Sequence, residues 1–235
     1  MHSRQERREE GRGARMQMLQ THRASARIQR TILAAVLMAS LLMVVGVLLV
    51  GCSSQPSEQQ GDEASANTPK TVLVAYYSAT GSTQAVAEKI AAHLDADLFE
   101  IVPVEPYSQD DLNYNDEQSR VVKEHEAPEL QDVALATTTP ENFDQYETVF
   151  IGYPLWWGQA AWPVDSFVVD NDFSGKTVIP FCTSASSPLG SSAQNLHALN
   201  QTGTWLDGVR FSSSATQDDV DEWITGQVEP ALSNN

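Results

Sequence analysis

Apolar and polar positions along residues 71–228 follow two periods that predict strands and helices in turn. Runs of β-branched, aromatic and apolar residues predict strands at 71–77, 97–102, 147–153 and 177–182, and a weaker one at 205–211. Apolar positions spaced three or four apart predict helices at 83–94, 163–170, 191–199 and 217–228. Strands that alternate with helices imply a three-layer α/β fold: a doubly wound, five-stranded parallel sheet with helices on both faces.

Three local signals refine these elements. Pro163 fits the first turn of its helix. Thr216 and Asp219 have the spacing of a capping pair. Pro180 lies inside a strand, where it removes a hydrogen-bond donor, so we expect a bulge or an unpaired position there.

The turn between the first strand and the first helix is rich in hydroxyl groups and contains one glycine. It reads Ser78-Ala79-Thr80-Gly81-Ser82-Thr83. Backbone N–H groups at a helix N-terminus bind anions, and the helix dipole adds positive potential. Without a basic side chain, this turn favours a phosphate monoester held by hydrogen bonds. The same residue types also cap helices and form turns for structural reasons, and that interpretation stays open.

A second candidate loop follows the strand 147–153. It reads Pro154-Leu155-Trp156-Trp157-Gly158. Neighbouring side chains at a strand end point to opposite sides, so at least one tryptophan is expected to be exposed and to have a flat partner. Ligands of open α/β sheets bind at the carboxyl ends of strands where the strand order reverses, so the two loops are expected to meet there.

Three motifs together resemble the flavodoxin family, over residues from about Lys70 to the C-terminus. They are Tyr77–Thr83, Gly152–Gly158 and Ile179–Ser184, in the order that the family has. The resemblance implies non-covalent FMN, with its phosphate on residues 78–83 and its ring between residues 154–158 and 183–190. It also implies that Trp156 or Trp157 stacks on one face of the ring. Gly158 is then a candidate for a peptide that flips on reduction, because glycine tolerates positive φ at little cost.

The expected cofactor-binding residues come from three loops. They are Ser78, Ala79, Thr80, Gly81, Ser82, Thr83, Pro154, Leu155, Trp156, Trp157, Gly158, Thr183, Ser184, Ser186 and Gly190. The third loop departs from ordinary flavodoxins, which often place an acidic residue or a tyrosine there, because it is small and hydroxylic as far as Pro188. The second face of the ring is therefore expected to be open to a substrate. No catalytic residue and no metal site stand out from the spacing.

Residues 103–146 are longer than one crossover helix requires. Their polar stretch from Asp111 to Arg120 is interpreted as a solvated helix and loop. The alternative is a lid beside the flavin, with Tyr114 or Arg120 near the ring.

The first 51 residues are predicted to be an export signal rather than part of the fold. Residues 1–30 carry eight Arg against three Glu, and the stretch from Ile32 to Val50 is uncharged. Leu49-Val50-Gly51-Cys52 resembles a bacterial lipobox, which implies that Cys52 is lipidated and the preceding segment removed. The alternative is an uncleaved signal anchor. Both place residues 70–235, the flavodoxin-like domain, on the extracytoplasmic face of the cell membrane, after a flexible tether at 52–69.

From Cys52 onward the chain has six Lys and Arg against 28 Asp and Glu, a net charge near −22. Nucleic acid and anionic lipid surfaces are therefore poor partners, whereas a basic redox partner protein is favoured. Cys182 remains as an unpaired cysteine, interpreted as a small buried hydrophobe.

Three functions are compatible with these patterns. The first is an FMN-binding one-electron carrier, favoured because the chain shows no second glycine-rich dinucleotide fingerprint. The second is an FMN-dependent NAD(P)H:quinone-type oxidoreductase with a small quinone-like acceptor. The third is a flavin-free lipoprotein that uses the cleft for binding alone.

Overall fold

The computed structural model describes residues 71–233, so the expected signal segment, the tether and Cys52 lie outside the described residues. The parallel sheet has the strand order β2-β1-β3-β5-β6, which confirms the predicted doubly wound, five-stranded sheet. The outermost position is shared by two short strands, β6 and β7, that both pair parallel to β5. The strands are β1 Val72–Tyr76, β2 Asp97–Glu100, β3 Thr148–Trp156, β5 Thr177–Thr183, β6 Thr204–Trp205 and β7 Val209–Phe211.

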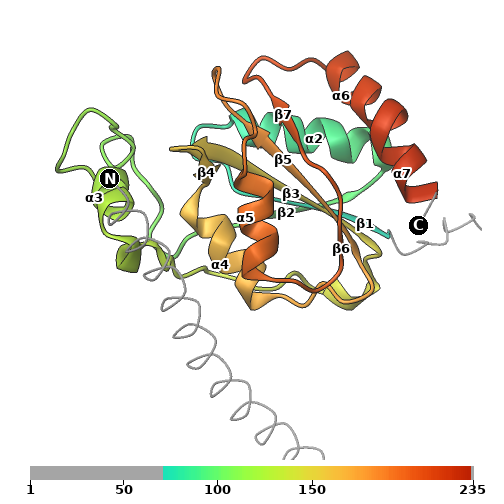
Figure 1. The fold of residues 1–235 in the computed structure, drawn as a ribbon, viewed down its shortest axis with the longest axis horizontal. Coiled ribbons are helices and arrows are strands. Elements are labelled where there is room, and N and C mark those ends of the chain that lie inside the picture. Colours follow the sequence, from blue (N-terminus) through green and yellow to red (C-terminus); the bar gives the residue numbers. More distant parts are fainter. Residues whose placement is uncertain (1–70, 234–235) are drawn as a thin grey trace, which may run out of the picture. The chain divides into compact units, whose positions relative to one another are not determined.

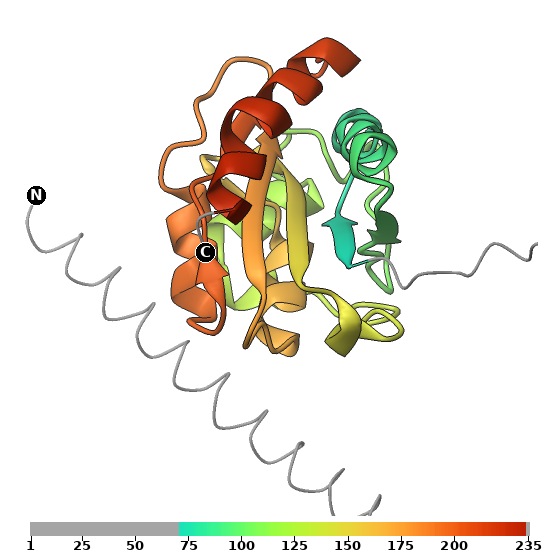
Figure 2. The same cartoon turned by 90° about the vertical axis from the view of Figure 1, so that its right-hand side faces the viewer.

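Helices cover both faces of this sheet, as Figures 1 and 2 show. On one face lie α2 (Ser82–Leu94) and α6 (Gln217–Trp223); on the other lie α4 (Trp162–Asp170) and α5 (Ser192–Leu199), with α3 (Arg120–Glu126) beyond them. Shorter elements complete the domain: η1 Pro128–Gln131, η2 Phe143–Gln145, β4 Gln159–Ala160, the π segment η3 Ile224–Val228 and α7 Glu229–Ser233.

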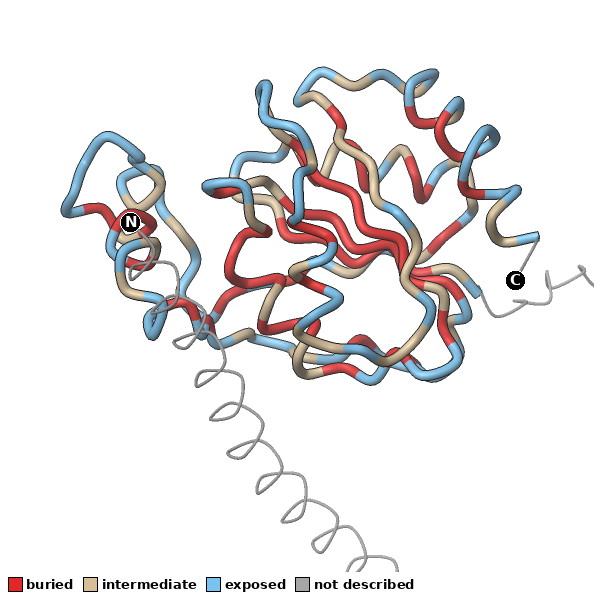
Figure 3. Tube along the Cα trace, viewed as in Figure 1, coloured by how far each residue is buried: buried red, intermediate tan, exposed pale blue. Residues whose placement is uncertain are grey.

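The core consists of two apolar layers, one on each side of the central strands, which appear as the buried centre of Figure 3. Alternate residues of β1 and β3 feed opposite layers: Val74 and Phe150 pack toward α2, whereas Leu73 and Val149 pack toward α4. These strands are apolar on both faces because helices cover both, which is why the sequence shows continuous apolar runs there.

The structure corrects one predicted strand and one predicted loop. The strand expected at 147–153 continues to Trp156 and pairs antiparallel with β4, so residues 154–158 form part of a β-hairpin rather than an open loop. Pro154 does not end the strand because its missing N–H lies on the side of β1, which ends at Tyr76, while its carbonyl accepts from the N–H of Ala161.

The predicted strand at 205–211 is two strands separated by a gap beside Pro180. The N–H of Leu206 donates to the carbonyl of Val178, and the N–H of Ser184 donates to that of Phe211. Since backbone groups alternate along a strand, Pro180 faces the gap between β6 and β7, and the expectation of an unpaired position is confirmed.

The helix ends agree with their sequence signals, with one exception. Pro163 lies in the first turn of α4, and Thr216 and Asp219 form a capping box at the start of α6. The helix predicted at 217–228 is confirmed, but its second half, Ile224–Val228, is a π segment and helix continues through α7. Within residues 71–233, no helix is both long enough and apolar enough to cross a membrane.

Candidate functional site

The three predicted loops emerge side by side at the carboxyl edge of the sheet. The N–H of Tyr77 donates to the carbonyl of Gly152 at 3.0 Å, which joins the end of β1 to β3. Pro154 is the ladder partner of Thr183, which joins β3 to the end of β5. The hydroxyls of Thr83 and Thr183 lie 2.7 Å apart and are buried, so the first and third loops are tied directly.

The first loop has the features of an anion cradle. Gly81 precedes α2 with φ 87°, and no side chain caps the first N–H groups of this helix. A Cβ at Gly81 would meet open space, so backbone and ligand can approach each other closely there. The hydroxyl of Ser78 is buried and has no hydrogen-bond partner among the described residues. A buried hydroxyl without a partner is costly, and a phosphate oxygen at this place would satisfy it.

The other residues of this loop differ in exposure. Thr80 and Gly81 are exposed, Ala79 and Ser82 are half-buried, and Thr83 is buried against Thr183. Exposed loop backbone beside an uncapped helix start therefore remains available to a ligand.

The helices that directly follow the three candidate loops share one feature, the absence of a side-chain cap. The helices α2, α4 and α5 begin without a side-chain cap. By contrast, Ser119 caps α3 and Thr216 caps α6 through their hydroxyls. The uncapped starts leave N–H donors near the three loops, as binding of a polar, anionic group requires.

The hairpin separates the two neighbouring tryptophans, as the sequence predicted. Trp156 is buried, and its ring packs edge-on against Tyr77, Tyr107 and Trp162. Trp157 is 39% exposed. Either tryptophan was expected to stack on a flavin. Trp156 is part of the core, and Trp157 reaches the surface.

Residues 107–131, which we call the cap, pack against this hairpin rather than standing free in solvent. The ring of Tyr107 contacts Trp156, and those of Tyr114 and His125 contact Trp157. Residues 113–118 are exposed, as the interpretation of this stretch as a solvated helix and loop requires, but Tyr114 also contacts the hairpin. The rings of His125 and Trp157 are stacked, with 5° between their planes. The sequence around His125 gives no signal of this contact.

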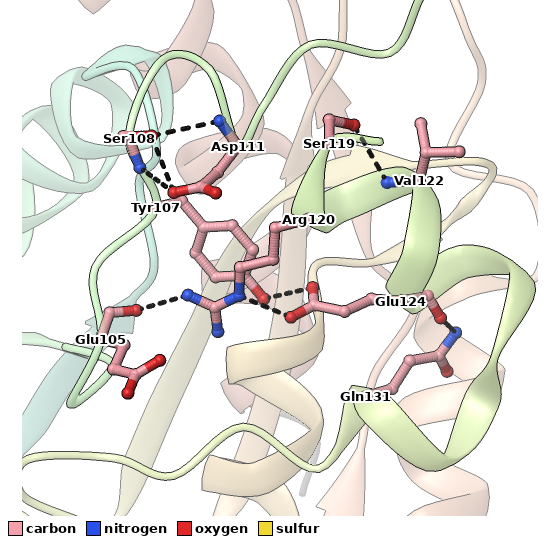
Figure 4. A network of polar contacts seen from close by, with 9 residues as sticks. All are labelled: Glu105, Tyr107, Ser108, Asp111, Ser119, Arg120, Val122, Glu124 and Gln131. Atoms are coloured by element: carbon pink, nitrogen blue, oxygen red, sulfur yellow. Dashed lines mark hydrogen bonds and ion pairs between the residues drawn. The ribbon is translucent and has the colours of Figure 1, made fainter. Parts of the chain in front are cut away.

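A buried carboxylate organises the cap, as Figure 4 shows. Glu124 accepts hydrogen bonds from the hydroxyl of Tyr107 at 2.6 Å and from Nε of Arg120 at 2.7 Å. The guanidinium of Arg120 also lies over the Tyr107 ring, 3.9 Å from its centroid. Burial, and then the hydrogen bond to Glu124, raise the pKa of Tyr107, so it stays a neutral donor. Burial acts to lower the pKa of Arg120, but the bond to Glu124 and its neighbours outweigh burial and raise it.

The third loop is held by a residue that the sequence reasoning missed. Arg210 in β7 donates to the carbonyls of Ser184 and Ala185, at 2.7 and 2.8 Å, and to the Ser184 hydroxyl at 3.0 Å. Ser186 is exposed, and Gly190 has φ 57° just before α5. A lone arginine on a short strand gives no sequence signal, because its partners are backbone carbonyls far along the chain.

Cys182 is a buried thiol at the end of β5. Burial raises its pKa to about 12, although Arg210 acts in the opposite direction. This agrees with the interpretation of Cys182 as a small hydrophobe.

Comparison with known proteins gives a consistent result. A family model described as flavodoxin matches residues 71–227. The solved structure of a candidate flavoprotein from Bacteroides eggerthii is 35% identical to this chain, with a TM-score of 0.61; the match covers 67% of this chain and 98% of that one. A second candidate flavoprotein, from Bacteroides uniformis, is 34% identical, with a TM-score of 0.61, over 66% of this chain and 97% of its own. A search of curated proteins finds no match.

Proposed function

The chain belongs to the flavodoxin family, and on that premise we propose that it binds FMN at the carboxyl edge of the sheet and serves as an electron-transfer protein. One observation carries the cofactor assignment: the buried Ser78 hydroxyl without a described partner, beside the uncapped start of α2. These donors fit a phosphate group, and the bound flavin would supply the redox chemistry. The 78–83 loop holds the phosphate end, and the hairpin and the third loop flank the ring.

The test is a fluorescence titration of the full chain with FMN and with riboflavin, which lacks the phosphate. Hydrogen bonds to a charged group contribute about 1.5–3 kcal/mol each, so we expect FMN to bind roughly ten- to a hundredfold more tightly than riboflavin. Ser78→Ala should reduce this preference, whereas Ser214→Ala, on an exposed loop, should not. Equal affinity for both flavins would refute the phosphate site, and failure of both to bind would favour a flavin-free binding lipoprotein.

One observation favours a second candidate function. Residues 185–188 of the third loop are exposed, and they include no aromatic side chain that could cover the ring. An open ring face can admit a small flat acceptor, so FMN-dependent reduction of a quinone-like compound by NAD(P)H is the alternative. Rapid quinone-dependent oxidation of NADH or NADPH by the FMN-loaded chain would establish it.

We also propose that Cys52 carries a lipid that holds the domain on the extracytoplasmic face of the bacterial membrane. The support is the sequence Leu49-Val50-Gly51-Cys52 after an uncharged apolar run. Mass spectrometry of the N-terminal peptide of the membrane-extracted chain should find a lipid-modified Cys52. A Cys52→Ser variant should lose the modification, and an unmodified, intact N-terminus in the parent chain would indicate a signal anchor instead.

The acidic composition bears on the redox partner. The chain from Cys52 onward, with a net charge near −22, attracts a basic protein surface and repels anionic surfaces. Electron transfer to a basic partner protein should therefore slow as the salt concentration rises, because screening weakens this attraction.

A further inference from the structure

The cap has no part in the proposed function so far, although several hydrogen bonds hold it together and it packs against the hairpin. Its helix α3 is capped by the hydroxyl of Ser119, which accepts from the N–H of Val122. Its other end is fixed where the side chain of Gln131 donates to the carbonyl of Glu124 at 2.7 Å. Together with the Tyr107–Glu124–Arg120 cluster, these bonds connect the parts of the cap to one another (Figure 4).

The cap contacts the tip of the hairpin through two aromatic rings. The His125 ring stacks on Trp157 with 4.2 Å between ring centroids and 5° between planes. The Tyr114 ring lies 4.8 Å from the Trp157 ring at 54°. Burial raises the pKa of Tyr114 to about 12, as expected for a side chain held against protein. Trp157 therefore contacts two rings from residues that lie far from it in the sequence, although it and Tyr114 stay 39% and 48% exposed.

The hairpin turn itself has a demanding backbone geometry. Trp157 and Gly158 connect the paired residues Trp156 and Gln159, with φ 49° and 75°. Two consecutive positive φ values in a two-residue hairpin define a type I′ turn. Turning the peptide between Trp157 and Gly158 over would give a type II′ turn, whose first residue takes a conformation open to glycine and strained for other residues. Trp157 occupies that position.

We propose that His125 and Tyr114 are positioning residues that lock the peptide between Trp157 and Gly158 in a single orientation. This inference rests on the proposed function, since residues 154–158 form one of the three loops expected beside the flavin. It reverses the expectation that Gly158 marks a flipping peptide. Space at Gly158 is open, so the constraint comes from the preceding residue and the rings that hold it. A fixed peptide would present the same hydrogen-bonding groups to the flavin before and after reduction. It would therefore not raise the midpoint potential of the first electron relative to that of the second.

The lock is tested first without flavin, by hydrogen–deuterium exchange of the full chain at the amides of residues 157–159. His125→Ala should speed this exchange roughly two- to tenfold, the range for loss of one aromatic pair. His125→Phe keeps a flat ring and should restore slow exchange. The matched control is His197→Ala, because His197 stacks on Trp205 in a similar way, at 5.3 Å and 16°, outside the cap. Unchanged exchange in His125→Ala would overturn the inference.

The second measurement uses the FMN-loaded chain and follows the midpoint potentials of the first and second electron. Trp157→Gly permits both peptide orientations and should widen the separation between the two potentials; His125→Ala should widen it less. An unchanged separation in Trp157→Gly would also overturn the lock. If the parent chain binds no FMN, the proposed function fails, while the exchange experiment still decides whether the cap holds the turn.

Discussion

Removal of the Glu124 carboxylate should destabilise the domain more than its place in a short peripheral helix suggests. Its side chain is 6% exposed and bonds both the Tyr107 hydroxyl and Nε of Arg120. Glu124→Ala leaves the Tyr107 hydroxyl without its acceptor, at a cost of about 1–3 kcal/mol. It also leaves a cation without its partner.

The cost of the unpaired cation is limited by solvent. Breaking a fully buried ion pair costs about 3–5 kcal/mol, but the Arg120 side chain is 25% exposed and can be hydrated in part. We therefore expect Glu124→Ala to lower the free energy of unfolding by about 2–4 kcal/mol. Arg120→Met in the same chain should recover part of this loss, because it removes the unpaired charge.

The assay is urea unfolding of the full chain, in which the midpoint should fall while the slope stays the same. Glu88→Ala is the control, since Glu88 is exposed and accepts a bond from the neighbouring Gln84 side chain; its expected cost is within about 0.5 kcal/mol. A loss in Glu124→Ala no larger than that of this control would refute the view that the carboxylate organises the cap.

Three further predictions concern the core and the helix layer. Gly152→Ala should destabilise the domain by about 1–3 kcal/mol or more in urea unfolding, because a Cβ there would lie 2.2 Å from the buried Phe181 ring; a neutral effect would contradict the close approach. Hydrogen bonds from Gln217 and then His93 lower the pKa of Asp221, so its contribution to stability is present above the ordinary carboxyl value of 3.8 and disappears as the pH falls through its lower folded value. Asp221→Asn should therefore reduce the loss in free energy of unfolding as the pH falls from 3.8 through the lower folded pKa of Asp221. An unchanged loss would refute the assignment. Cys182 should react with a thiol reagent at the rate of unfolding, since it is buried and its pKa is about 12; fast labelling of the folded chain would show an open route to it.

The sheet and its covering helices could be predicted because each strand or helix has its own periodic spacing of apolar residues. Thr71–Tyr77 and Thr148–Tyr153 are apolar runs, and α2 carries Val86 and Ile90 on one face. The position of the 78–83 turn between β1 and α2 could be predicted for the same reason, whereas its role as a phosphate site stays a prediction.

The hairpin was missed because its residues give the wrong local signals. Pro154 suggests the end of a strand, and Trp157-Gly158 is not one of the common hairpin pairs. The turn nevertheless adopts positive φ at a tryptophan, and the rings of His125 and Tyr114 pack on that tryptophan. These contacts join residues more than thirty positions apart in the sequence. Because the residues around them are polar, no periodic apolar pattern predicts the contacts.

The parallel direction of the strands also decides which way the domain faces. The described chain enters β1 at Val72, at the amino edge of the sheet, and the three loops lie at the opposite edge. At about 3.3 Å per residue, the length of β1 separates the two edges by roughly 17 Å. The described chain therefore enters the domain at the edge opposite the candidate site. Whatever lies before Val72 in the chain thus joins the domain away from the three loops, so a fusion or surface attachment made at that end leaves the loops accessible.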